Sequence, residues 1–541
     1  MTTQFVRDLK QEFSGYRTGT LVQDLLAGLT VAAVALPLAL AFGVGSGADA
    51  AAGLVTAIIA GLLIGALGGA SFQISGPTGA MAAILLPLSA RFGVQGVLAA
   101  GFLSGIILLV AALLKAGRIV SIIPSAVITG FTSGIAILIA FGQIDNFFGT
   151  RSHGESIITK IASYAELGFA VQWQPMFFGL LVMAVMIAWP KAWAAKVPSS
   201  LVGIIIAMVV NMLGPFDVAE VGAIPRSLLL ENRFTFSLLH GEMLGALAAP
   251  AFSIAALGMI ESLLCGAAGG KMKKERLQAD RELIAQGLGN ILIPLLGGVP
   301  ATAAIARTSV AIKAGGRTRL TSIFHSVTLI ASMFLLGPFM SRIPLAALAG
   351  VLMMTAWRMN EWESITHFFK KAYKTSIAQF LVTMLATVVF DLTIAIIIGI
   401  GLSMFLFVIR SSQLEITVSN IDERHERGRN LTAKMSAVRL VYVTGPLFFG
   451  SQERMVNTIE EIEGAKTIIL SIRGVPSIDH SAMVALEELH ESLAAKQITL
   501  LFCGLQPQVK QQFERGGFDT VVGPSAIFNN AVEAIDSIGQ E

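Results

Sequence analysis

A series of apolar runs between Leu25 and Val408 constrains the fold more than any other feature of this sequence. Each run is roughly 15 to 25 residues long, the length that a helix needs to cross the hydrocarbon core of a bilayer. Charged residues make up only 13% of the chain, about half of their usual share in a soluble protein. We therefore predict a polytopic α-helical membrane protein with fourteen transmembrane segments, at residues 24–44, 51–70, 78–91, 94–114, 119–142, 174–189, 199–213, 245–268, 283–296, 301–313, 320–341, 343–357, 375–389 and 391–409.

Two of these segments, 78–91 and 301–313, are short and follow similar glycine-rich stretches, at residues 68–83 and 297–307. Each stretch has a Gly-Gly pair, a proline and a threonine before the apolar run, and proline favours the first turn of a helix. Each short segment is third in a set of seven, so the second set crosses the membrane in the opposite sense, as in a 7+7 inverted repeat. Two helices that begin inside the membrane would direct two positive dipole ends at one anion site. The alternative is that both are ordinary packing helices.

The distribution of lysine and arginine supports this topology. With the N-terminus inside, the inner loops hold 16 of these residues and the outer loops hold 6, as the positive-inside rule requires. We expect a cytoplasmic N-terminus at 1–20, a transmembrane domain at 21–410, a cytoplasmic C-terminus, and location in the cell inner (plasma) membrane.

The composition changes after Arg410. Residues 411–430 are polar and are interpreted as a linker. Residues 431–541 are predicted to form a small cytoplasmic α/β domain, because short β-branched runs alternate with helical stretches. The predicted strands are Val438–Val443, Thr467–Ile472 and Ile498–Cys503, and the predicted helices lie at about 452–463, 481–495, 506–515 and 526–538.

Ionisable residues inside a membrane are costly and each is a functional hypothesis. Glu261 lies midway along the eighth segment, where burial disfavours the charged form, so it could take up and release a proton during transport. The alternative is a structural glutamate. Arg307 lies in the second short segment and could bind an anion through its planar fork, or act as the counter-ion of Glu261. Asp24 and Asp391 are interpreted as structural helix caps, and His325 as a packing or capping residue.

Several functional classes have no support in this sequence. It contains no G-x-x-x-x-G-K-[ST] phosphate loop, and residues 287–290 are too short for a dinucleotide-binding motif. The two cysteines, Cys265 and Cys503, lie in different kinds of segment and are unlikely disulfide partners. No catalytic or metal-ligand cluster stands out. We therefore expect a protein that is not an enzyme, with no cofactor, no metal and no nucleic-acid partner.

Several motifs resemble the SulP family, the bacterial relatives of the solute carrier 26 anion transporters. They are ALPLALA at 35–41, ISGPT at 74–78, GFTSG at 130–134 and QGLGN at 286–290, and PLFFG at 446–450 is similar to the start of a STAS domain. The resemblance implies a fourteen-helix arrangement of core and gate domains, a C-terminal cytoplasmic STAS domain at 431–541, and a homodimer in the lipid bilayer.

The resemblance also implies where a small anion binds, between the first helix and the starts of the third and tenth helices. The implied substrate-binding residues are Phe42, Thr78, Gly79, Ala80, Ala304, Ile305 and Arg307. Members of the family often have Ser or Thr near Ala304 and Ala306, so backbone N–H groups and Arg307 would carry more of the binding here. Glu261 matches the acidic position of the eighth helix, which is Asp followed by Thr in the sodium-coupled bicarbonate branch. Glu261 with Cys265 favours H⁺ over Na⁺ as the coupling ion.

Within the family, residues 260–265 and 301–307 are most similar to the C4-dicarboxylic acid transporter branch. The resemblance implies a secondary active transporter of small anions, of the C4-dicarboxylate, sulfate or bicarbonate class, working as a proton symporter with an elevator-like movement. The alternatives are a sodium-coupled bicarbonate symporter, an anion channel or exchanger, and a membrane-anchored sensor.

In the STAS domain, residues 478–482 (IDHSA) occupy the position of the phosphorylation loop of anti-sigma-factor antagonists. Ser481 matches the phosphorylated serine, which makes it a regulatory candidate. The alternative is a plain helix N-cap, a role that suits Asp479 or Ser481. A cytoplasmic partner of this domain is a further expectation.

Overall fold

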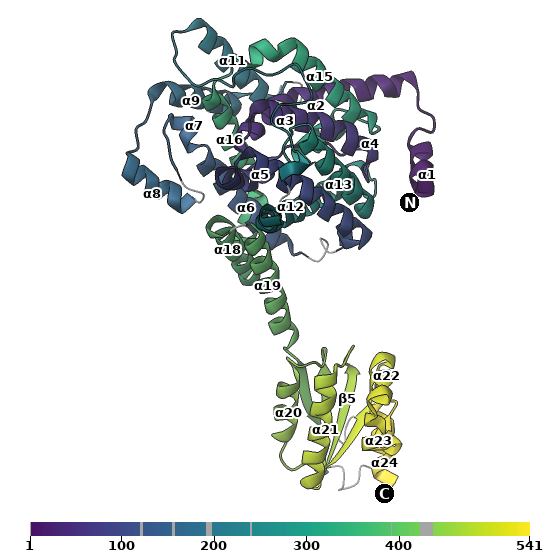
Figure 1. The fold of residues 1–541 in the computed structure, drawn as a ribbon. Coiled ribbons are helices and arrows are strands. Elements are labelled where there is room, and N and C mark those ends of the chain that lie inside the picture. The colour runs from purple at the N-terminus through teal and green to yellow at the C-terminus, as the bar shows by residue number, and fades with distance from the viewer. Residues whose placement is uncertain are drawn as a thin grey trace. The chain divides into compact units, whose positions relative to one another are not determined.

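The computed structural model describes residues 2–118, 123–153, 157–190, 197–238, 241–390, 392–421 and 436–540. Two compact units are present, Met1–Ile400 and Gly401–Glu541, drawn in Figure 1. The first unit is almost entirely helical and the second is an α/β domain. Asp391, predicted to be a cap, lies outside the described residues.

Each of the fourteen predicted segments coincides with a helix. Within the described ranges, seven helical stretches are long and apolar enough to cross a membrane, and shorter apolar helices accompany them. Gly93, with φ +67°, joins the third and fourth segments into one kinked element, because glycine adopts this conformation at no steric cost. The elements that correspond to the fourteen segments are α2 (Thr18–Gly45), α3 (Ala50–Ile59) with η1 (Ala60–Ile64) and α4 (Gly65–Leu67), α5 (Gly79–Leu113), α6 (Ser125–Gly142), α9 (Trp173–Ala188), α11 (Ser199–Leu213), α12 (Gly241–Lys273), α13 (Ala279–Leu295), α14 (Ile305–Lys313), α15 (Leu320–Met340), α16 (Leu345–Met359), α18 (Lys374–Val389) and α19 (Leu392–Ser411).

Among the described residues of the first unit, four helices were not predicted. They are α1 (Thr2–Glu12), α7 (Ile144–Phe148), α8 (Ile157–Leu167) and α17 (Trp362–Lys370). Each has at most 11 residues and carries polar side chains, so none has the length and composition of a membrane-crossing segment.

Several sets of helices pack closely within the first unit. Helix α5 packs against α12 and α13, and α2 packs against α3 and α15; α6 packs against α18, and α9 against α11 and α16. Glycines permit the close α5–α13 crossing, since a Cβ on Gly105 would lie 2.7 Å from the carbonyl oxygen of Gly287. The glycines of the motif at 286–290 therefore have a packing role.

Asp24 has a structural role, as predicted, but it does not cap a helix: it anchors the turn that precedes α15. It is fully buried in α2 and accepts hydrogen bonds from the backbone N–H groups of Arg317 and Thr318, at 2.6 and 3.1 Å, just before α15. His325 is also buried, in the second turn of α15, and within the described chain neither ring nitrogen has a hydrogen-bond partner. It therefore packs, and it does not cap a helix.

The second unit contains a five-stranded sheet in the order β3-β4-β5-β6-β7. β3 is antiparallel to β4 and the remaining pairs are parallel, with helices around the sheet (Figure 1). The three predicted strands are confirmed as β4, β5 and β6. The elements are β3 (Glu415–Asn420), β4 (Val438–Thr444), α20 (Gln452–Glu460), β5 (Thr467–Gly474), α21 (His480–Ala495), β6 (Thr499–Cys503), α22 (Pro507–Gly516), α23 (Phe518–Val522), β7 (Ile527–Phe528) and α24 (Ala531–Gln540).

Strand β3 differs from the prediction, because residues 415–420 lie in the stretch interpreted as a linker. The strand is at the edge of the sheet and none of its residues is fully buried. A solvated edge strand carries polar side chains on both faces, so its composition is similar to that of a linker.

Candidate functional site

The two short segments meet end to end at the centre of the first unit. Strand β1 (Ser75–Gly76) pairs antiparallel with β2 (Thr302–Ala303), and Gly76 is opposite Thr302. Helix α5 begins at Gly79 and α14 begins at Ile305, directly after these strands. The free N–H groups at the two helix starts are therefore near each other, which is the arrangement that favours an anion.

The two helix starts are capped differently. The Thr78 hydroxyl oxygen accepts a hydrogen bond from the backbone N–H of Met81 at 3.3 Å and so caps α5. Ala304, at the equivalent position of α14, has no side-chain cap. The first-turn amides of α14 therefore remain more available to a ligand than those of α5.

Glu261 of α12 connects both helix starts. Its Oε2 atom accepts hydrogen bonds from the hydroxyl groups of Thr78, at 2.9 Å, and Thr302, at 2.7 Å. Sequence reasoning found Glu261 and Thr78 but missed Thr302. The signal was present in the sequence, since both glycine-rich stretches have a threonine shortly after their proline.

Arg307 lies behind the junction of the two helix starts. Its side chain is only 1% exposed, its Nη2 atom donates to the carbonyl oxygen of Pro77 at 2.9 Å, and Nη1 has no partner within the described chain. The structure describes both Arg307 and Glu261 and records no ion pair between them. The guanidinium therefore connects α14 to the residues that precede α5. Its positive charge would attract an anion electrostatically.

The remaining expected binding residues surround the start of α5 and the start of α14. Phe42 and Ala80 are buried, and a Cβ on Gly79 would lie 3.2 Å from the Phe42 ring. Ile305 is 47% exposed and Ala304 is half-buried. The accessible side of the junction is therefore the first turn of α14, with the Phe42 ring against the first turn of α5.

Buried polar side chains hold the β1–β2 ladder in place. The Ser262 hydroxyl accepts a hydrogen bond from the Ala303 N–H at 3.2 Å. Asn290 accepts from the Ala301 N–H at 2.7 Å and donates to its carbonyl oxygen at 2.9 Å. Gln286 donates to the Ser75 hydroxyl at 2.9 Å. Gln286 and Asn290 belong to the motif at 286–290, but their supporting role could not be assigned from sequence.

In the second unit, Asp479 is the N-cap of α21. Its Oδ1 atom accepts from the Ala482 N–H at 2.8 Å, and its Oδ2 atom accepts from the Phe449 N–H at 3.0 Å. Ser481 follows in the first turn, half-buried, and does not serve as the cap. The N-cap role therefore belongs to Asp479, and the regulatory role of Ser481 stays a prediction.

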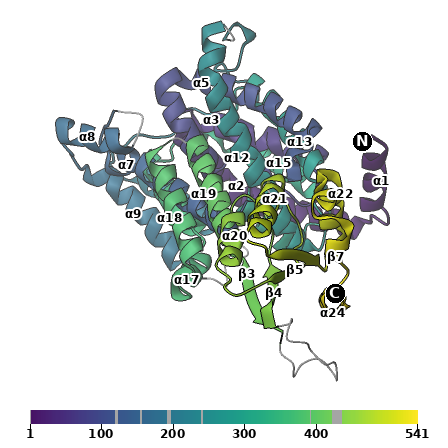
Figure 2. The same ribbon diagram turned by 90° about the horizontal axis from the view of Figure 1, so that it is seen from below.

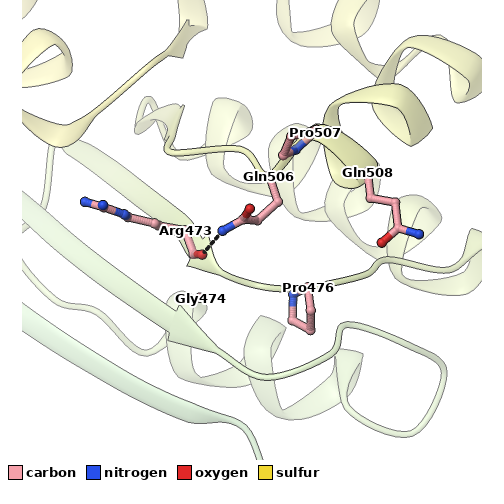
Figure 3. Close-up of a pocket in the computed structure, with 6 residues that line it drawn as sticks. All are labelled: Arg473, Gly474, Pro476, Gln506, Pro507 and Gln508. Atoms are coloured by element: carbon pink, nitrogen blue, oxygen red, sulfur yellow. Dashed lines mark hydrogen bonds between the residues drawn. The ribbon is translucent and has the colours of Figure 1, made fainter.

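An open hollow of about 590 Å³ lies on the surface of the second unit. Figure 3 shows Gln506 beside the end of β5, where its side chain donates to the carbonyl oxygen of Arg473 at 2.9 Å. The hollow is far in sequence from every expected binding residue.

Among the described residues, no group of three or more His, Cys, Asp or Glu side chains is arranged to hold a metal ion. The surface hollow of the second unit described above is lined by Arg473, Gly474, Pro476, Gln506, Pro507 and Gln508.

Comparison with known proteins places this geometry among anion transporters. Residues 21–386 match the profile of the sulfate permease family and residues 431–534 match that of the STAS domain. The putative sulfate transporter YvdB of Bacillus subtilis is 33% identical, over 96% of this chain and 98% of its own length. The bicarbonate transporter BicA of Synechocystis is 28% identical, over 95% and 93%.

Two solved structures extend the comparison to the fold. The transmembrane domain of a cyanobacterium bicarbonate transporter BicA superposes with a TM-score of 0.65 at 27% identity, over 71% of this chain and 98% of that domain. The murine solute carrier 26 family member A9 anion transporter, in the inward-facing state, gives a TM-score of 0.82 at 17% identity, over 96% and 92%. The second likeness concerns the fold alone.

Proposed function

Because this chain belongs to the sulfate permease family and carries its STAS domain, we propose that it is a proton-coupled symporter of a small anion. The chain is an anion transporter of the sulfate or bicarbonate type, and not an enzyme. We further propose that a proton is transported with the anion, that an elevator-like movement carries both, and that the anion is of the class argued below.

The observation that carries the proposal is the position of Glu261 between the two half-helix starts, bonded to Thr78 and Thr302. An ionised carboxylate repels an anion bound at the same helix starts. At an effective dielectric of about 20 and a separation of about 6 Å, this repulsion is roughly 3 kcal/mol, or about 100-fold in affinity. Protonation removes it, so the proton and the anion each favour binding of the other.

The anion would be held mainly by backbone N–H groups. Ala304 and Ala306 contribute no hydroxyl group, so the first turns of α5 and α14 supply the donors and buried Arg307 supplies a positive field. Phe42 forms an apolar wall beside Gly79. A C4-dicarboxylate, sulfate or bicarbonate meets these requirements, and the similarity of residues 260–265 and 301–307 to the dicarboxylate branch favours the first.

The test is uptake into proteoliposomes with labelled succinate, fumarate, sulfate and bicarbonate, with and without an inward proton gradient. We expect counterflow of at least one anion and accumulation that follows the gradient. Glu261→Gln should retain counterflow and lose the acceleration by the gradient. The matched control is Glu166→Gln, because Glu166 is an exposed carboxylate outside the site. This variant should behave as the wild type. Full gradient-driven uptake by Glu261→Gln contradicts the proposal.

Sodium coupling is a second candidate, favoured by one observation. The Glu261 carboxylate and the hydroxyl groups of Thr78 and Thr302 bring three oxygen atoms together, and oxygen atoms are the ligands of hard cations. If uptake requires Na⁺ and its rate does not change with the proton gradient, the coupling ion is Na⁺ and not H⁺. Anion flux that never accumulates against a gradient would indicate a channel or an exchanger.

A further inference from the structure

Helix α17 has two chemically different faces. Trp362, Ile365 and Phe369 recur at helical spacing along one side, and His367 and Lys370 lie on the other side with further polar residues. No residue of α17 is fully buried. Since α17 follows the twelfth predicted segment, it is on the same side of the membrane as the N-terminus. Figure 2 shows it at the end of α18, at the rim of the helical unit.

The aromatic side chains of this region contact one another but remain largely exposed. The Trp362 indole N–H donates to the carbonyl oxygen of Trp357 at 3.1 Å, and the two indole rings are 4.6 Å apart. The Phe369 ring meets Phe380 of α18 edge-on at 6.2 Å. Trp357, Trp362 and Phe369 nevertheless remain 61%, 45% and 49% exposed. Tryptophan concentrates where a protein meets the boundary between lipid and water.

Three lysines follow this aromatic group directly. Lys370, Lys371 and Lys374 are exposed, and in the described part of the chain no carboxylate forms an ion pair with any of them. Ala372, with φ +51°, makes the turn between α17 and α18, and Tyr373 in the same turn is 50% exposed. A cluster of basic residues on an amphipathic helix suits an anionic membrane surface.

We propose that α17 lies in the inner-leaflet interface, and that Lys370, Lys371 and Lys374 bind the phosphate groups of anionic phospholipids. Two observations select the bilayer as the occupant. The charge of the lysine cluster is complementary to anionic headgroups. Helix α18, which follows directly, also has an exposed apolar side, which includes Val382, Leu385 and Val389. A hollow of about 390 Å³ along the polar side of α17, lined by Trp362, Glu363, Thr366, His367 and Lys370, leaves room for a headgroup.

The test uses detergent-solubilised full-length protein titrated with dibrominated phosphatidylglycerol, which quenches tryptophan emission on contact, and with dibrominated phosphatidylcholine for comparison. Trp362→Phe defines the share of the signal that α17 contributes. The binding variant is Lys370→Gln/Lys371→Gln/Lys374→Gln. The control is Lys271→Gln/Lys274→Gln/Lys313→Gln, which removes the same charge from exposed lysines at the C-terminal ends of α12 and α14.

We expect phosphatidylglycerol to quench Trp362 at lower concentration than phosphatidylcholine does. Each lysine near an anionic surface contributes about fivefold in affinity, so the binding variant should weaken the phosphatidylglycerol titration by about 100-fold and the control by far less. Equal quenching by the two lipids, an unchanged titration in the binding variant, or an equal loss in the control overturns the proposal. None of these outcomes depends on which anion is transported.

Discussion

Asp24→Asn should destabilise the first unit by several kcal/mol although it changes one atom of the side chain. Oδ1 accepts from the backbone N–H groups of Arg317 and Thr318 and from the Thr321 hydroxyl, at 2.6, 3.1 and 2.9 Å. Oδ2 accepts from the hydroxyls of Thr318 and Tyr16, at 2.6 and 3.0 Å. The two backbone N–H groups can only donate, so an amide must keep its oxygen towards them. Its NH₂ group then faces the hydroxyls of Thr318 and Tyr16, which can accept by rotation.

The magnitude follows from the loss of the charge. With the NH₂ group in the place of Oδ2, the three bonds to Oδ1 remain but their acceptor becomes neutral. A hydrogen bond to a charged group contributes about 1.5–3 kcal/mol and a neutral one about 0.5–1.5 kcal/mol, so the three bonds together lose about 3 kcal/mol. The opposite orientation sets the NH₂ group against the two backbone N–H groups and costs more.

The assay is the free energy of unfolding in mixed micelles, measured by titration with a denaturing detergent. Asp49→Asn is the matched control, because Asp49 is exposed and its one cap bond to the Ala52 N–H, at 2.7 Å, is equally available to Asn. It should change stability by less than about 0.5 kcal/mol. If Asp24→Asn lies within about 1 kcal/mol of the wild type, the assignment of Asp24 as the anchor of the turn before α15 is refuted.

Three further predictions concern packing, titration and the β1–β2 ladder. Gly53→Ala should cost about 1–3 kcal/mol, because the new Cβ would clash with the carbonyl oxygen of Ala39 in α2. Gly19→Ala, with nothing within 4 Å, should be neutral or stabilising in the same titration. Burial, and then the hydrogen bond to Asp24, raises the pKa of Tyr16 to about 12. The contribution of Tyr16 to stability is therefore complete below pH 10 and is lost as the pH rises towards 12. Tyr16→Phe should flatten this fall in stability, and an unchanged slope would contradict the role of the Tyr16–Asp24 bond. Asn290→Ala leaves the N–H and C=O groups of Ala301 buried without their partner, and should cost about 2–4 kcal/mol and slow transport; full stability and wild-type uptake would exclude a supporting role.

The helical framework was predictable because membrane-crossing segments need a minimum apolar length. The same rule marked Glu261 as exceptional, since a charge inside an apolar segment needs a reason. The likeness of the two glycine-rich stretches placed the half-helix starts, and the antiparallel pairing of Gly76 with Thr302 agrees with it.

Partners distant in the chain could not be predicted from local patterns. The bond from Thr78 to Glu261 joins residues 183 positions apart, and that from Thr318 to Asp24 joins residues 294 apart. Arg307 shows the same limit: its bond to the carbonyl oxygen of Pro77, 230 positions away, could not be predicted from its place in α14. Helix α17 was missed because it is too short to span a membrane, and its two faces become informative only when its exposure is known.

If an anion and a proton move together through the junction that Glu261 connects, anion entry must change the internal pH. This can be measured in proteoliposomes that contain a pH-sensitive dye, with the membrane potential clamped and no initial pH gradient, after addition of the anion that the counterflow assay identifies. We expect the lumen to acidify in step with entry of the labelled anion, and Glu261→Gln to admit the anion without acidification. Anion entry by the wild-type protein at constant internal pH would contradict this expectation.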